Sequence, residues 1–218
     1  MPYKNVIFDY DGVLVQSLDP WYAAMDKTNT EFNISMDDRQ KMYVMPEFDR
    51  AGELGIPKDK LESYKTRLRA VAMPAVHAAP FYDWVKEMLS SLTKGGLKLS
   101  VLSGNTHLRM YLDEKGISNY FEPYIISGAD VKNKKPDPEG IEKLLVMMKA
   151  SRSETVLVGD SGSDIEASNS AHIDSILFYP KDHARFYDLK ELKAQKPTHI
   201  VASHQELEKL LLDQRKEK

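Results

Sequence analysis

Two acidic residues that follow one apolar run are the strongest chemical signal in this 218-residue sequence. Residues 6–8 are apolar, Asp9 and Asp11 come next with one residue between them, and Gly12 follows. An apolar run bounded by a turn residue predicts a buried strand, and open α/β sheets bind their ligands at the carboxyl ends of such strands. Two buried carboxylates side by side are costly unless a cation or a proton compensates them. For this segment alone, a capped strand end with solvated acids remains an equal alternative.

Three later segments carry polar residues that a parallel sheet would bring to the same edge. They are Ser103, Gly104 and Asn105 after the strand candidate 97–102, Lys135 before a proline, and Asp160 and Asp164 after the strand candidate 155–158. Carboxylates suit Mg²⁺, a hydroxyl beside a helix N-terminus suits an anion, and a lysine suits negative charge that develops on a phosphoryl group. Taken singly, each has an ordinary interpretation as a loop acid, a turn or a surface lysine.

The elements that must position these residues alternate between strand and helix after residue 80. This alternation predicts an α/β fold of the Rossmann-like, doubly wound type, with a mostly parallel sheet covered on both faces. Residues 16–79 show helical spacing and no strand-like alternation. We therefore expect a catalytic core made of residues 1–15 and 80–218, and a helical cap domain, residues 16–79, inserted after the first strand.

Helix boundaries follow from capping residues and prolines. We expect helices capped by Asp19, with Pro20 as the first helical residue, and by Asp37, and a third helix that ends before Pro74. A further helix would carry Phe81 and Trp84 on its apolar face.

Composition limits the classes of function. The formal net charge of −3 gives no reason to expect a nucleic acid or an anionic membrane as partner, and the absence of cysteine excludes disulfides and thiolate chemistry. No run approaches the ~20 apolar residues of a membrane span, and no signal peptide is evident. We expect a cytoplasmic protein, monomeric by default. The six histidines show no metal-ligand spacing, and we expect surface or capping roles for them.

Four segments together resemble the motifs of the haloacid dehalogenase superfamily, in the family's order. They are residues 8–14 (FDYDGVL), 102–105 (LSGN), 135–138 (KPDP) and 158–164 (VGDSGSD). The helical insertion lies where one class of family cap lies, and the whole resembles the branch of phosphoglycolate phosphatases and β-phosphoglucomutases. The chain departs from the family pattern at Gln16, where an acid is usual, and at Phe81, where glycine is usual.

The resemblance implies roles for the acids. Asp9 would be the nucleophile that accepts the phosphoryl group, and Asp11 the general acid and then the general base. Mg²⁺ would be held by Asp9, Asp160 and the backbone carbonyl of Asp11, with Asp164 orienting the water shell of the metal.

The resemblance also implies how substrate is bound. Ser103, Gly104 and Asn105 would bind the phosphate, and Lys135 rather than its neighbour Lys134 would neutralise charge on the nucleophile and on the phosphoryl group. Arg50, in a cap loop, is a candidate contact for an anionic group of the substrate.

The activity expected is Mg²⁺-dependent hydrolysis of a small phosphorylated metabolite through an aspartyl phosphate, similar to that of phosphoglycolate phosphatases. A phosphomutase of the β-phosphoglucomutase type and a non-catalytic protein that binds a phosphorylated ligand are the alternatives. A dehalogenase is disfavoured because that branch typically lacks the second acid, which is present here as Asp11.

Overall fold

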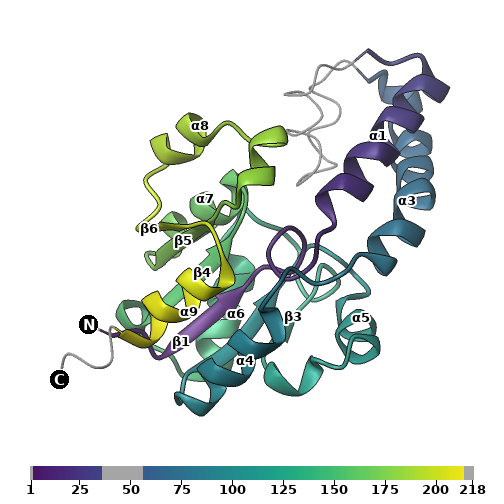
Figure 1. Cartoon of the computed structure of the whole chain (residues 1–218). Helices are drawn as coiled ribbons and strands as arrows, with labels where there is room; N and C mark the ends of the chain where they lie inside the picture. The colour runs from purple at the N-terminus through teal and green to yellow at the C-terminus, as the bar shows by residue number, and fades with distance from the viewer. Residues whose placement is uncertain (1, 36–55, 214–218) are drawn as a thin grey trace.

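A single six-stranded sheet forms the centre of the molecule (Figure 1). The computed structural model describes residues 2–35 and 56–213. All strand pairs are parallel, in the order β3-β2-β1-β4-β5-β6. The strands are β1 (Asn5–Phe8), β2 (Lys98–Leu102), β3 (Ile125–Ile126), β4 (Thr155–Gly159), β5 (Asp174–Phe178) and β6 (His199–Val201). The order reverses at β1, which lies between β2 and β4, so the doubly wound α/β fold is confirmed.

Helices cover both faces of the sheet because the strand residues alternate between two apolar clusters. Val6 and Phe8 of β1 point into the cluster on one face, and Ile7 points into the cluster on the other. The first cluster includes residues of α4 (Val85–Lys94), α5 (Leu108–Glu114) and α9 (His204–Asp213), and the second includes residues of α6 (Glu139–Met148) and α7 (Gly162–Ser170). A short helix, α8 (Leu189–Ala194), precedes β6 and was not predicted.

Two helices outside these layers pack on each other. α1 (Leu18–Phe32) and α3 (Leu61–Ala78) stand side by side beyond the carboxyl end of β1 (Figure 1). Their shared apolar cluster is separate from the clusters of the sheet. The buried Tyr64 hydroxyl donates to Asn29 Oδ1 at 2.7 Å across this interface. The limits of the cap domain, residues 16–79, stay a prediction, and Asp37 and Arg50 lie outside the described residues.

Three predicted helix boundaries are wrong. The N-cap of α1 is Ser17 and the helix begins at Leu18, two residues before the expected Asp19 cap and Pro20 start. α3 continues through Pro74 to Ala78, because the buried face of the helix continues beyond the proline to Val76 and packing outweighs the lost hydrogen bond. α4 begins only at Val85, because Trp84 has a left-handed backbone conformation with φ 70°.

Two histidines are buried, which corrects the expectation of surface or capping roles. His183 and His204 are 0% and 2% exposed and lie against Tyr82 and Phe178. The Nε2 atom of His204 donates to the backbone oxygen of Val13 at 2.9 Å. Val13 comes directly after the segment Asp9–Gly12. Burial lowers the pKa of each imidazole to about 4. Apolar periodicity does not reveal such residues, because their burial depends on aromatic partners from distant segments.

Candidate active site

Three of the predicted site residues follow adjacent strands. Asp9 comes after β1, Ser103 after β2 and Asp160 after β4, and β1 pairs with both of the other strands. All three side chains are buried. The parallel arrangement places them at one edge of the sheet, at the position where the strand order reverses.

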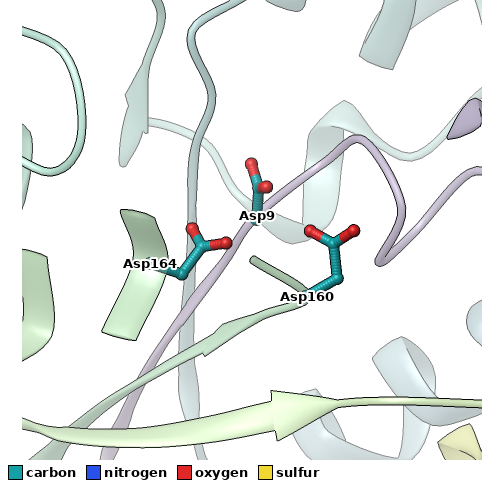
Figure 2. A group of neighbouring side chains, drawn as sticks. All are labelled: Asp9, Asp160 and Asp164. Atoms are coloured by element: carbon teal, nitrogen blue, oxygen red, sulfur yellow. The ribbon is translucent and has the colours of Figure 1, made fainter. Parts of the chain in front are cut away.

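The carboxylates of Asp9, Asp160 and Asp164 form a buried cluster (Figure 2). One oxygen of each lies within 4.8 Å of the others, and the three side chains come from the ends of two strands and the first turn of α7. Burial raises the pKa of Asp9 to about 7, with Lys135 opposing this shift and Asp164 and Asp11 adding to it. Burial and the neighbouring Asp164 and Asp9 also raise the pKa of Asp160. Burial and mutual repulsion therefore disfavour the fully ionised form of this cluster.

Lys135 is the cation at this edge. Its Nζ lies 2.9 Å from Asp9 Oδ1 and 2.5 Å from Asp164 Oδ1. Burial disfavours the charged amine, but the two carboxylates outweigh this and raise the pKa of Lys135. Asp9 Oδ1 also accepts a hydrogen bond from the backbone N–H of Tyr10 at 2.8 Å, so two donors fix the orientation of this carboxylate. Lys134 also lines the cavity, and its side chain passes close to Gly104.

Asp164 is held by the N-terminus of its own helix. Its Oδ2 accepts a hydrogen bond from the backbone N–H of Ser161 at 3.1 Å, and the side chain of Ser161 accepts one from the backbone N–H of Asp164, which together form a capping box. The hydroxyl of Ser161 also donates to Asp164 Oδ2 at 2.6 Å. A Cβ on Gly159 would lie 2.2 Å from the Asp164 carboxyl carbon, so this position requires glycine. The capping box was not predicted from the sequence, because Asp164 was interpreted only as a residue that orients the water shell of the metal.

Asp11 faces the same site from the loop after β1. Burial raises the pKa of its carboxyl, while Ser17, Lys135, Ser103 and Trp21 act in the opposite direction. Its Oδ1 is buried without a hydrogen-bond partner among the described residues. A raised pKa shifts the carboxyl group toward its protonated form.

Gly12 allows the loop to pass beside Asp160. Its φ is +71°, and a Cβ would lie 2.2 Å from Asp160 Oδ2. Any side chain here would therefore be strained in its backbone and would also displace the Asp160 carboxylate. Glycine is therefore required here both by the backbone conformation and by the space that the Asp160 carboxylate occupies.

The phosphate-binding residues predicted from sequence form the turn after β2. The backbone N–H of Asn105 donates to Ser103 Oγ at 3.2 Å, and the backbone N–H of His107 donates to Asn105 Oδ1 at 2.9 Å. Ser103, Gly104 and Asn105 line the same cavity as the carboxylates. This turn thus presents a hydroxyl and backbone groups next to Lys135.

One cavity of about 500 Å³ joins these residues to the α1–α3 pair. Sequence reasoning missed three of the residues that line it: Trp21 of α1, Arg69 of α3 and Tyr187 before α8. The Tyr187 hydroxyl hydrogen-bonds to Asp160 and acts to lower the pKa of that carboxyl. The backbone oxygen of Tyr187 accepts a hydrogen bond from the Tyr179 hydroxyl at 2.7 Å. No sequence pattern identified these three residues, because only the tertiary fold brings them to the cavity.

The donor set fits a hard divalent cation. Clustered carboxylates are the protein ligands that Mg²⁺ prefers. Asp160 Oδ2 is buried without a hydrogen-bond partner among residues 2–35 and 56–213, and it lies in the acidic cluster. Asp164 is already occupied by Lys135 and Ser161, so Asp9 and Asp160 are the carboxylates best placed to hold an ion.

Among the described residues, none of the helices combines the length and the apolar character that crossing a bilayer requires.

Comparison with known proteins gives consistent matches over most of the chain. Residues 6–178 match the family model described as haloacid dehalogenase-like hydrolase. A phosphoglycolate phosphatase of Aquifex aeolicus is 30% identical over 175 residues, covering 77% of this chain and 81% of the relative. A phosphoglycolate phosphatase of Colwellia psychrerythraea is 26% identical over 186 residues, covering 78% and 82%.

A solved structure supports the fold. The crystal structure of a hydrolase from Pseudomonas syringae superimposes with a TM-score of 0.79 over 96% of this chain and 98% of the other, at 20% identity. An experimentally determined hydrolase therefore shares this fold along nearly the whole length of both chains.

Proposed function

The chain belongs to the haloacid dehalogenase-like hydrolase family, and from this premise we propose that it is a Mg²⁺-dependent phosphatase acting through an aspartyl phosphate on Asp9. Its substrate would be a small phosphomonoester, and the names of the relatives make phosphoglycolate the first compound to assay. The observation that carries the proposal is the convergence of Asp9, Lys135 and Asp160 at one edge of the sheet, at distances that suit a shared ion and a shared phosphoryl group.

The metal would be held by Asp9 and Asp160 and by the backbone carbonyl of Asp11. When bound, Mg²⁺ supplies positive charge that offsets the repulsion between a carboxylate nucleophile and a phosphate dianion. The raised pKa values of Asp9 and Asp160 support this, because burial and the neighbouring carboxylates disfavour negative charge at a place where a bound cation would stabilise it.

In the first half-reaction, a carboxylate oxygen of Asp9 attacks the phosphorus atom, and the bond from phosphorus to the leaving oxygen breaks. Asp11 gives its proton to that oxygen, so the alcohol leaves neutral. Lys135 stays protonated and stabilises the negative charge that is spread over Asp9 and the phosphoryl oxygens.

In the second half-reaction, Asp11, now ionised, takes a proton from water as the water oxygen attacks phosphorus. The bond between Asp9 and phosphorus breaks, inorganic phosphate leaves, and both acids return to their starting forms. Ser103 and the backbone groups of the turn after β2 orient the phosphoryl oxygens throughout.

The helical segment 16–79 is proposed as the cap that excludes water during the reaction. Its α1–α3 part has its own apolar cluster and lines the cavity with Trp21 and Arg69, which supports this assignment. We also propose that the protein acts as a monomer in the cytoplasm.

The experiment is a phosphate-release assay on a panel of phosphorylated metabolites, with and without Mg²⁺, for the wild type and for Asp9→Asn. Release that needs both Mg²⁺ and Asp9 is expected. Isomerisation of a sugar phosphate without free phosphate, followed by phosphorus NMR, would show a phosphomutase instead.

A further inference from the structure

The cavity has a second wall whose chemistry the reaction centre does not use. Opposed to the acids and the turn after β2, the α1–α3 pair contributes Leu18, Trp21, Arg69, Ala70 and Met73. Among the described residues of this wall, the polar side-chain group besides Arg69 is the indole N–H of Trp21, which hydrogen-bonds to Asp11. The wall therefore begins at the general acid and extends away from it along α3.

Arg69 is the charged residue that the described parts of α1 and α3 bring to this cavity. The neighbouring Arg67 does not line it, since its guanidinium makes two hydrogen bonds to Glu31 of α1, at 2.6 and 2.7 Å. Met73 lies four residues after Arg69, one helical turn along the same face. A cation beside an apolar surface is thus a feature of the cavity wall itself.

The phosphoryl group does not account for this wall. Lys135, Ser103 and the acidic cluster already provide for it at the sheet edge. A cavity of about 500 Å³ also has room for far more than a phosphoryl group and a two-carbon alcohol. A substrate whose phosphoryl group lies at the sheet edge would bring the part beyond its ester oxygen toward Arg69, Trp21 and Met73, which line the rest of the cavity.

We propose that Arg69 is a specificity-determining residue, which binds an anionic group on the leaving part of the substrate, while Trp21 and Met73 contact an apolar or planar portion of that part. The proposal rests on the phosphatase function proposed above. A guanidinium suits a carboxylate or a second phosphate because it offers several donors in one plane. Binding energy gained away from the phosphorus atom raises kcat/KM for substrates that carry the anionic group relative to substrates that lack it.

The experiment compares two probes that differ by one anionic group, phenyl phosphate and 4-carboxyphenyl phosphate, each with Mg²⁺. The wild type is expected to show a kcat/KM about tenfold higher for the carboxylated ester, the size of one charge-assisted hydrogen bond. In Arg69→Gln that preference should fall to about one, with kcat/KM for phenyl phosphate changed by less than about threefold. Arg69→Lys should retain part of the preference.

Arg67→Gln is the matched control, since it removes an arginine from the same helix but from outside the cavity. Its preference should equal that of the wild type, and melting curves check that both variants fold. A preference that survives in Arg69→Gln, or that is absent in an active wild type, overturns the assignment of Arg69. Absence of phosphate release from both esters and from the metabolite panel overturns the phosphatase function and this inference with it.

Discussion

The two walls of the cavity differ in how firmly their side chains are held. At the sheet edge, Lys135 lies 2.5 Å from Asp164 and 2.9 Å from Asp9, and both acids are buried. On the α1–α3 wall, Arg69 is exposed and Trp21 is half-buried. One wall is charged and fixed by short contacts, and the other is mostly apolar and open to solvent.

Under the proposed function, this difference would separate the chemical step from the choice of substrate. Electrostatic catalysis requires groups that are already in place when charge develops, because reorienting them during the reaction would cost energy. A surface that selects leaving groups gains from being adjustable and from closing over what it binds. Substitutions at the edge should therefore affect all substrates equally, and substitutions on the other wall should change the ranking of substrates.

Asp9→Asn should have the largest effect. The amide cannot act as a nucleophile, so phosphate release should fall by about 10⁴-fold or more for every ester tested. The melting temperature should stay the same or rise, because one of the clustered negative charges is removed. Asp113→Asn, an exposed acid on α5, serves as control and should behave as the wild type does. An Asp9→Asn protein that retains substantial turnover would remove the basis for assigning chemistry to this edge.

Lys135→Ala should reduce turnover of all esters by about 10²- to 10³-fold, since it removes the cation shared by Asp9 and Asp164. Lys134→Ala is the matched control at the adjacent position and should change kcat by less than about tenfold. Steady-state kinetics of both variants on two esters make the comparison. The reverse order of effects would mean that the wrong lysine was assigned.

Mg²⁺ should stabilise the folded protein as well as support turnover. Binding to the native state alone adds about 2.7 kcal/mol to the free energy of unfolding when the ion is present at 100 times its dissociation constant. The shift in melting temperature should be seen with the wild type and largely lost in Asp160→Asn, because Asp160 is one of the two carboxylates placed to hold the ion. Equal shifts in the two proteins, or full activity in excess chelator, would count against the site.

The buried residues His183 and His204 should make the free energy of unfolding depend on pH. His183 and His204 have pKa values of about 4 in the folded protein, below the ordinary 6.5, because burial disfavours the charged imidazole. The unfolded chain therefore binds more protons between pH 6.5 and pH 4, so the stability that these residues contribute above pH 6.5 is lost as the pH falls. With Mg²⁺ present, we expect a loss of about 2 kcal/mol for each of the two histidines between pH 7 and pH 5.

NMR titration of the imidazole signals gives the direct readout of this prediction. The signals of His183 and His204 should remain those of neutral rings at pH 5. Titration of both rings near pH 6.5 would show that they are not buried as described.

Tyr64→Phe should have the smallest effect and should be confined to the α1–α3 pair. It removes the 2.7 Å hydrogen bond to Asn29 and leaves a buried oxygen without its donor, at a cost of about 1–2 kcal/mol. Hydrogen exchange should become faster in α1 and α3, while kcat for a small phosphomonoester with an uncharged leaving group stays within about twofold of the wild type. A large fall in kcat would mean that the two walls do not act separately.

The sequence predicted the sheet and the residues at its edge because both depend on local signals. An apolar run followed by a polar residue places Asp9, Ser103 and Asp160 at strand ends, and parallel pairing then brings them together. The structure shows this convergence directly, including the contact of Lys135 with Asp9.

The remaining residues could not be predicted because their surroundings come from distant parts of the chain. Arg69 becomes part of the cavity only through the packing of α3 on α1, and Tyr187 reaches Asp160 from a segment in which no helix was expected. The α3 helix also continues through Pro74, since the buried face on both sides of the proline outweighs the local preference. In each case a tertiary contact decided what the local sequence left open.

The central claim is that Asp9 carries the phosphoryl group during turnover, and trapping the phosphorylated protein tests it most directly. The wild type would be mixed with a radiolabelled phosphomonoester and Mg²⁺, quenched in acid within one turnover, and digested. We predict label on the peptide that contains Asp9, and none in the Asp9→Asn protein. Release of labelled phosphate with no labelled protein at any time in the turnover, or label on a different residue, would contradict the account.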